Sequence, residues 1–241
     1  MVEINLRSCL DFETDKGFEP ISLSNLREMI DYFEYGTTRR IYLLILLCTG
    51  GRPSEPLLLN WNNNFSDNLI IYKTTKGSKI SRICKIPPLI QNELEHYRDN
   101  NFFPRGQIFS FQYKAFQRYF NDHVRDKLSQ DFQKLCPFSY DGSVKQRHKI
   151  TLRSLRVTIA TLIYYYFKKV YGDSVALSRT CMWMGHESRN MTADHYIKHI
   201  HKLGIEDYPD LPLLQLLDHI VYHEHQIRLD CYVRQSKMAE F

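Results

Sequence analysis

The chain has 241 residues, of which 43% are hydrophobic, enough to bury one sizeable core or one core with an appendage. Gly and Pro are scarce, at 10 and 9 residues, which excludes disordered and collagen-like folds. The formal net charge of +5 mildly favours a polyanionic partner but does not establish one.

The six cysteines are scattered and form no C-x-x-C pair, so we expect no zinc ribbon and no metal site. Several lie in apolar runs, where cysteine behaves as a small hydrophobic residue, which favours a reducing compartment. The N-terminus is charged, unlike a signal peptide. The longest apolar run, Ile41 to Cys48, is too short to cross a bilayer, so we expect an intracellular protein without a membrane partner.

Residues 1–20 are polar and irregular, and the first predicted helix follows them. Ser22 or Ser24 can cap this helix, which runs to about Tyr35 with one apolar stripe. A second helix over Thr38–Thr49 is apolar almost all round, so we expect it to be buried.

Gly50 and Gly51 end the second helix, and a short helix over 52–59 follows. Leu69–Lys73 and Ile80–Ile86 are β-rich runs on either side of Lys76-Gly77-Ser78, which predicts a hairpin. Residues 129–150 are polar and predict a loop. The remaining segments predict helices at about 88–98, 112–127, 153–168, 174–184, 191–199 and 211–234. The expected fold is mainly α with a small antiparallel β-sheet, an α+β class.

Two segments in the first half carry side chains suited to phosphate chemistry. Arg52 follows a buried helix and two glycines, although a surface arginine at a helix end would look the same. Lys76 lies at the hairpin tip, and a lysine there can protonate a leaving oxygen if its pKa is lowered. The alternative for Lys76 is a solvated turn residue.

Two segments in the second half complete the set. Arg153 and Arg156 are three residues apart, so on a helix they share a face and repel unless an anion such as phosphate lies between them. The alternative is a solvated pair, but the surrounding residues are apolar. His186 follows a glycine, and Tyr196 lies ten residues later on a short helix. Alone, one tyrosine among 16 is more simply explained by packing.

In order, these segments resemble the catalytic domain of the tyrosine recombinase (phage integrase) family. Residues 49–55, Thr-Gly-Gly-Arg-Pro-Ser-Glu, resemble the family motif Thr-Gly-x-Arg-x-Ser-Glu, and Lys76 lies 24 positions after Arg52 on the expected hairpin. Residues 155–161 resemble Leu-Arg-x-Thr-x-Ala-Thr, and Met-Gly-His at 184–186 resembles Leu-Gly-His. Residues 191–196, Met-Thr-Ala-Asp-His-Tyr, match the nucleophile segment. The resemblance spans about residues 20–200.

The resemblance implies a site-specific DNA recombinase or integrase that cleaves and rejoins DNA strands through a 3′-phosphotyrosyl intermediate, with no cofactor. Its implied partner is double-stranded DNA, bound by a homotetramer on paired sites, and no small-molecule substrate is expected. The protein would be DNA-associated, in a prokaryotic cytoplasm or in the nucleus or virion of a eukaryotic virus. The implied catalytic residues are Arg52, Lys76, Arg153, Arg156, His186 and Tyr196, with Glu55 in support and Lys73, Lys79 and Arg82 as DNA-binding residues.

The chain departs from the family pattern in two ways. Arg153 stands where the family usually has histidine, and an arginine cannot accept a proton near neutral pH. The alternative function is therefore a catalytically inactive DNA-binding or architectural protein that retains the fold. In addition, family members commonly carry an N-terminal domain that clamps the DNA, whereas only about 20 residues precede the first predicted helix here, so we expect either a fragment of a longer protein or a chain that manages with a single domain. In the first case residues 1–20 would be a remnant or linker from a missing core-binding domain, with 21–200 the catalytic domain and 201–241 a helical tail. The apolar face of that tail packs either on a neighbouring protomer or on its own domain.

Overall fold

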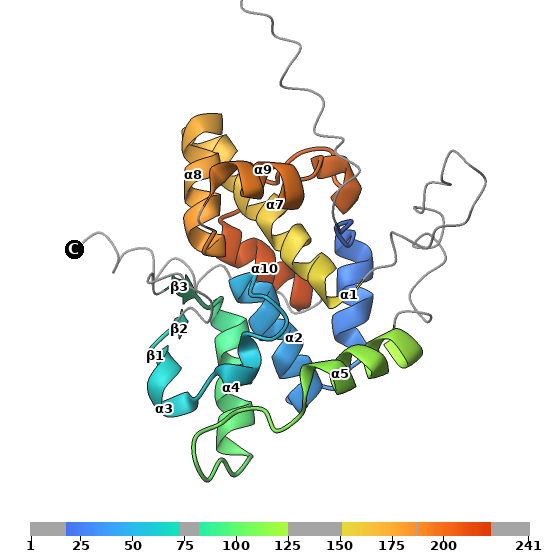
Figure 1. The fold of residues 1–241 in the computed structure, drawn as a ribbon, viewed down its shortest axis with the longest axis vertical. Helices are drawn as coiled ribbons and strands as arrows, with labels where there is room; N and C mark the ends of the chain where they lie inside the picture. The colour runs from blue at the N-terminus through green and yellow to red at the C-terminus, as the bar shows by residue number, and fades with distance from the viewer. Residues whose placement is uncertain (1–17, 73–81, 125–150, 187, 223–241) are drawn as a thin grey trace, which may run out of the picture.

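The computed structural model describes residues 18–72, 82–124, 151–186 and 188–222 (Figure 1). These residues are mainly helical, with one antiparallel sheet in the order β1-β2-β3, so the predicted α+β class is confirmed. In chain order the elements are α1 (Leu23–Asp31), α2 (Thr38–Thr49), η2 (Pro56–Leu58), α3 (Trp61–Asn64), β1 (Phe65–Ser66), β2 (Leu69–Tyr72), β3 (Arg82–Lys85), α4 (Pro88–Asp99), α5 (Tyr113–Tyr119), η3 (Phe120–Val124), α7 (Leu152–Tyr171), α8 (Asp173–Met184), α9 (Arg189–Tyr196), η5 (Ile200–Leu203) and α10 (Leu213–Val221).

Helix α2 lies at the centre of the fold and contacts α1, α4, α7 and β3 (Figure 1). All its residues from Arg40 to Thr49 are buried, as its uniformly apolar sequence predicts. The helix ends because Gly50 adopts a left-handed conformation, with φ of 58°. A Cβ on Gly50 would lie 2.8 Å from the sulfur of Met184, so only glycine fits this close approach. The predicted bounds of this helix are confirmed.

The sheet presents alternate residues of β3 to the interior. Arg82 pairs with Tyr72 of β2 and is buried, as is Cys84, whereas Ile83 and Lys85 are exposed. The two predicted strands are confirmed, and the short β1 and α3 before them were not predicted. The hairpin tip, including Lys76, lies outside the described residues.

Helices α7, α8 and α9 pack on one another (Figure 1). Thr151 and Ser154 form a capping box at the start of α7, which fixes where the helix begins. Gly185, at φ of 64°, ends α8, and Ser188 caps α9. The predicted last helix of this group extended to residue 199, but α9 ends at Tyr196 and the chain continues extended at Ile197.

The C-terminal helix is shorter than predicted, because α10 covers only Leu213–Val221 and Tyr222 leaves the helical conformation. Residues 223–234 of the predicted helix lie outside the described residues, as does the whole predicted loop at 129–150. The apolar face of α10 is buried against α1, α4 and α7 of its own chain. Asp218, on the same helix, accepts from the N–H groups of Leu89 and Ile90 at 3.1 and 3.2 Å and so caps α4.

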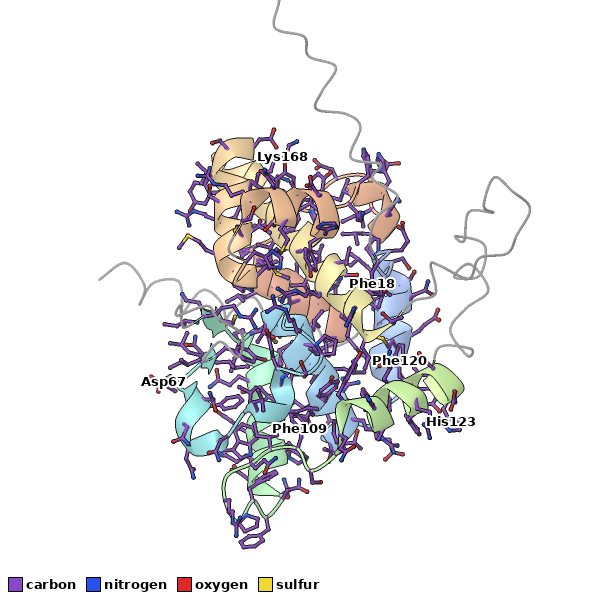
Figure 2. The ribbon with its side chains drawn as sticks, viewed as in Figure 1. Phe18, Asp67, Phe109, Phe120, His123 and Lys168 are labelled. Carbon is purple, nitrogen blue, oxygen red and sulfur yellow. The ribbon has the colours of Figure 1, made fainter. Side chains whose placement is uncertain are left out.

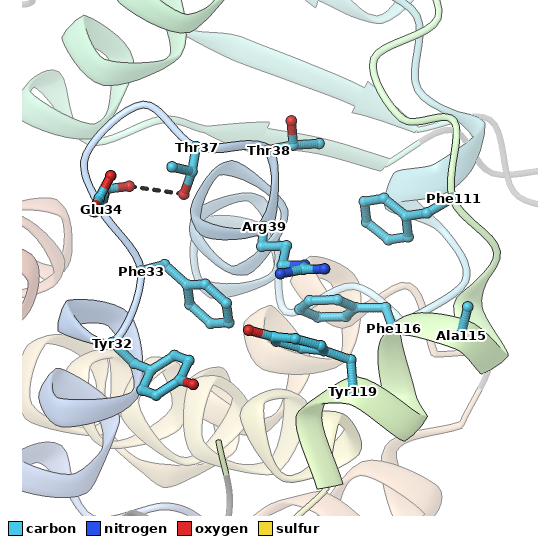
Figure 3. Close-up of a pocket in the computed structure, with 10 residues that line it drawn as sticks. All are labelled: Tyr32, Phe33, Glu34, Thr37, Thr38, Arg39, Phe111, Ala115, Phe116 and Tyr119. Atoms are coloured by element: carbon cyan, nitrogen blue, oxygen red, sulfur yellow. Dashed lines mark hydrogen bonds between the residues drawn. The ribbon is translucent and has the colours of Figure 1, made fainter. Parts of the chain in front are cut away.

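Apolar side chains such as Phe109 and Phe120 lie in the interior, whereas the charged or polar side chains of Asp67, His123 and Lys168 lie on the surface (Figure 2). An aromatic cavity of about 750 Å³ opens at the N-terminal end of α2, beside Phe116 and Tyr119 (Figure 3). This cavity is at the opposite end of α2 from Gly50. Within the described ranges, no helix combines the length and the apolar character that a membrane crossing needs.

Candidate active site

Arg156 extends from the start of α7 to the point where α2 and α8 end. Its side chain is buried, with the residue 2% exposed. One terminal nitrogen, Nη1, donates to the carbonyl of Gly50, and Nη2 donates to the carbonyl of Met184 at 2.8 Å and to His186 Nε2 at 2.7 Å. Carbonyls at helix C-termini lack partners within their helix and carry partial negative charge, so they suit a guanidinium. Burial, followed by the positive charge of Arg82, lowers the pKa of Arg156 to about 10.

Glu55 joins two further arginines to this cluster. It accepts from the Arg52 main-chain N–H at 2.8 Å and from Arg52 Nη1 at 3.0 Å. It also accepts from Arg82 Nη2 at 2.9 Å, while Arg82 Nη1 donates to the same Met184 carbonyl that Arg156 binds. Burial raises the pKa of Glu55, but the charges of Arg82 and Arg156 and the hydrogen bonds from Arg52 outweigh it and lower the pKa overall. Glu55 therefore stays ionised and holds both side chains in place.

The cluster carries more positive than negative charge. Among the described residues, Arg52, Arg82 and Arg156 meet around a single carboxylate, Glu55, which leaves a formal excess of two positive charges in this part of the chain. The side chain of Arg52 is 52% exposed, so the cluster is open to solvent on that side. Burial, with the charges of Arg156, Arg52 and Arg82, lowers the pKa of His186 to about 3, so the imidazole is neutral at physiological pH.

Tyr196 lies against this cluster. Its ring centroid is 4.4 Å from that of His186, and the guanidinium carbon of Arg156 lies 5.2 Å from the Tyr196 ring centroid. The backbone on either side of Ile197 lies against Thr161 of α7. The Thr161 hydroxyl accepts from the Lys198 N–H at 3.1 Å, and its one proton is shared between the carbonyls of Val157 at 2.9 Å and Tyr196 at 3.2 Å. These contacts hold the backbone at the point where α9 ends, with Tyr196 at the edge of the arginine cluster.

No protein-family model and no curated protein matches the sequence. Solved structures do match, among them XerA recombinase, with a TM-score of 0.52 and 19% identity over 87% of this chain and 65% of that one. The chain has a tyrosine recombinase fold. A lambda integrase dimer bound to a COC′ core site matches with a TM-score of 0.50 and 12% identity, and a lambda integrase tetramer bound to a Holliday junction with 0.50 and 14%. Each lambda match covers 83% of this chain and 52% of that one, so the chain spans less than two thirds of all three structures.

The recombinase fold brings together four of the residues expected to be catalytic: Arg52, Arg156, His186 and Tyr196. Glu55 contacts Arg52, as its expected supporting role requires. The other expected residues are placed differently. Arg153 is exposed, one turn before Arg156, with its guanidinium carbon 5.3 Å from the ring centroid of Phe18.

Three expected basic residues, Lys73, Lys76 and Lys79, lie outside the described residues, so their roles stay predictions. Arg82 was expected at the DNA surface, but its side chain is only 4% exposed and both terminal nitrogens bind protein acceptors. A role for Arg82 in DNA binding stays a prediction. In the structure, Arg82 and Arg52 form ion pairs with the same carboxylate, Glu55. The alternation of β3 was the signal for this inward orientation, because Arg82 and Cys84 are two residues apart on one face.

Sequence reasoning also missed Thr192, which lies 2.7 Å from the second ring nitrogen of His186. The available signal was its position four residues before Tyr196, on the same face of α9. Within the described part of the chain, no group of three or more His, Cys, Asp or Glu side chains is arranged to hold a metal ion. The arrangement offers a positively charged, partly open site with a phenol at its edge, which suits an anionic group that can be attacked by oxygen.

Proposed function

We propose that the chain is a tyrosine recombinase that cleaves and rejoins DNA strands through a 3′-phosphotyrosyl intermediate on Tyr196. One observation carries the proposal: Tyr196 packs on His186 and beside Arg156, in a cluster whose arginines exceed its carboxylates by two charges. A DNA phosphodiester supplies the missing negative charge and the phosphorus atom that a phenol oxygen attacks.

Each group in the cluster has a part in the proposed reaction. The Tyr196 oxygen forms a bond to phosphorus, and the bond from phosphorus to the 5′ oxygen of the next nucleotide breaks. Arg52 and Arg156 stabilise the charge that gathers on the non-bridging oxygens. The phenol loses its proton, and Lys76 is the proposed donor of a proton to the leaving 5′ oxygen. A 5′-hydroxyl from a second DNA end reverses these steps and seals the strand without ATP.

The proposed partners follow from the same chemistry. Joining new ends requires two cleaved strands and therefore more than one active site, so we propose a homotetramer on paired sites of double-stranded DNA. The match to a lambda integrase tetramer on a Holliday junction supports this assembly by analogy of fold. The protein would accordingly be DNA-associated and would serve a phage, virus or other mobile element.

Covalent capture of DNA tests the proposal directly. A library of nicked duplexes with randomised sequence around the nick serves as substrate, because the cleaved end then diffuses away and traps the intermediate. We expect the wild-type chain to form an SDS-resistant adduct and Tyr196→Phe to form none while still binding DNA. Tyr171→Phe, a change at a half-exposed tyrosine on α7, is the matched control and should react normally. An adduct that persists in Tyr196→Phe, or no adduct from wild type across the library, contradicts the proposal.

A second function is favoured by one observation, the exposed Arg153 in place of a histidine that could accept a proton. On this alternative, the fold binds DNA through its basic residues and never cleaves it. Binding would then weaken steeply with salt while no adduct forms under any condition. The capture experiment separates the two functions, because only the first predicts a band that shifts with covalently attached DNA.

A further inference from the structure

A chain of hydrogen bonds runs from Arg156 through His186 to Thr192, and its direction is set at the arginine end. Arg156 Nη2 lies 2.7 Å from His186 Nε2. A guanidinium has donors and no acceptor, so the imidazole nitrogen must be the acceptor in this bond. Nε2 therefore carries no proton.

The threonine end can complete the same direction. If Nε2 has no proton, the neutral ring carries it on Nδ1, which lies 2.7 Å from Thr192 Oγ1 and therefore donates to it. The hydroxyl proton of Thr192 has its own acceptor, the carbonyl of Ser188 at 3.2 Å, so Oγ1 is free to accept. The contacts at both ends fit the neutral tautomer of His186 that carries its proton on Nδ1.

The described surroundings shield this relay from solvent. Thr192 is fully buried and His186 is 9% exposed, so water has little access to either ring nitrogen. The Arg156 guanidinium also donates to the carbonyls of Gly50 and Met184, so its position depends on these two carbonyls and on His186. If one of these hydrogen bonds is lost, the guanidinium can shift, and a shift of a fraction of an ångström in a phosphate-binding group slows the reaction.

We propose that Thr192 is a positioning residue, which holds His186 in the Nδ1-protonated tautomer and thereby aims Arg156 at the scissile phosphate. This inference rests on the proposed function. Without the Thr192 hydroxyl, the Nδ1 proton is buried without an acceptor, and Arg156 alone holds the ring in this tautomer. The tautomer with its proton on Nε2 then gains population, and in that state the Nε2 proton faces an Arg156 N–H and the bond between them is lost. Thr192 also lies on α9 with Tyr196, so one hydroxyl links the nucleophile helix to the phosphate-binding arginine.

Two substitutions separate the hydroxyl from the packing volume. Thr192→Val keeps the shape of the buried side chain and removes the hydroxyl, whereas Thr192→Ser keeps the hydroxyl. We expect single-turnover adduct formation to fall about ten-fold in Thr192→Val, the effect of losing one hydrogen bond to a positioning group. Thr192→Ser should stay within about three-fold of wild type, and DNA affinity should be equal in all three, because the contact is internal.

The tautomer itself is the readout that a merely structural role would not move. Nitrogen-15 NMR of histidine-labelled protein, with the His186 signals assigned by their loss in His186→Gln, should show the proton on Nδ1 in wild type and a larger share of the Nε2-protonated tautomer in Thr192→Val. A proton on Nε2 in wild type, or a Thr192→Val variant that cleaves at the wild-type rate, overturns the inference.

The NMR measurement needs no DNA, so the two proposals fail in different ways. If His186 of the wild-type protein carries its proton on Nδ1 but no adduct forms, the proposed function is contradicted, and so is the positioning role of Thr192 in cleavage, while the hydrogen-bond chain remains supported. If the wild-type protein forms adducts but His186 carries its proton on Nε2, only the inference about Thr192 is contradicted.

Discussion

Two buried arginines at opposite ends of α2 are neutralised in different ways. Near the N-terminal end, Arg40 is 5% exposed and pairs with Glu93, whose carboxylate is fully buried, at 2.9 Å. Glu93 also accepts from the Gly36 N–H at 2.9 Å and from the Tyr222 hydroxyl at 2.7 Å. Near the C-terminal end, Arg156 is also buried, and its hydrogen-bond partners within the described ranges are main-chain carbonyls and a neutral imidazole.

The difference separates a structural charge from a functional one. Arg40 and Glu93 cancel each other, and their hydrogen bonds tie the turn after α1 and the end of α10 to the core. As far as the structure describes the chain, the cluster of Arg156 contains one carboxylate, Glu55, which already binds Arg52 and Arg82. Holding a buried positive charge without a direct counterion costs stability, so such an arrangement marks a site that an anionic ligand completes.

The largest expected effect is on stability at the compensated end. Arg40→Met should lower the free energy of unfolding by about 3–5 kcal/mol, because it leaves the negative charge of Glu93 buried without a counterion. Chemical denaturation monitored by circular dichroism measures the loss. The double variant Arg40→Met with Glu93→Leu should recover a large part of it. A single variant as stable as wild type would show that the pair does not have the structural role assigned to it.

At the uncompensated end the large effect should be on activity. Arg156→Lys keeps the charge but cannot bind two carbonyls and His186 at once. We expect adduct formation to fall about 10²- to 10³-fold, as for removal of a transition-state donor, while the lost buried hydrogen bonds lower the stability by about 1–3 kcal/mol. Cleavage kinetics and denaturation on the same preparation give both values. If this variant unfolds instead of losing activity, the distinction between the two ends is wrong.

Acid should act on the uncompensated end through His186. Its pKa falls from the ordinary 6.5 to about 3 on folding, because burial and the neighbouring arginines disfavour the charged ring. Between these values the unfolded chain binds a proton that the folded chain does not, so stability falls as the pH drops below 6.5, by about 1.4 kcal/mol per pH unit at most. His186→Gln should flatten this dependence between pH 6.5 and 4, and the exposed His219→Gln should not. Equal slopes in both variants would remove His186 as the cause.

A small stabilisation by an added anion should distinguish the uncompensated arginine cluster from the compensated Arg40–Glu93 pair. Sulfate, at several times its dissociation constant, should stabilise wild type by about 1 kcal/mol by binding the folded cluster. Arg52→Ala should reduce the gain, because Arg52 is the exposed cation of the cluster. Arg98→Ala, a change at a surface arginine paired with Asp99, is the control and should keep the gain. Thermal melts in sulfate against chloride of equal ionic strength measure the effect, and an Arg98-dependent gain would argue for surface binding only.

Local signals predicted much of the fold. The bounds of α2 follow from an apolar run ended by a glycine, and the structure places that glycine in the left-handed conformation. The end of α9 could not be predicted in this way, because it depends on Thr161, 35 residues earlier in the chain. The same holds for the end of α10 at Val221, since the apolar pattern continues beyond the point where Tyr222 turns to bind Glu93.

The sequence predicted which residues belong to the candidate site, but it did not predict how their side chains are arranged. Motif order selected Arg52, Arg156, His186 and Tyr196, yet nothing in the sequence shows that Arg156 is buried while Arg153, one turn away, is exposed. That difference comes from the carbonyls that two glycine-capped helices present to one face of α7. Contacts between distant helix ends are tertiary, so sequence periodicity does not encode them.

If Tyr196 is the nucleophile, its oxygen becomes bonded to a DNA phosphate, and peptide mapping of the captured adduct identifies the residue that carries this bond. After nuclease digestion and trypsin cleavage, mass spectrometry locates the residue that carries the nucleotide. The account predicts the modification on the peptide of residues 190–198, at its only tyrosine, Tyr196. A nucleotide attached at any other residue would contradict it.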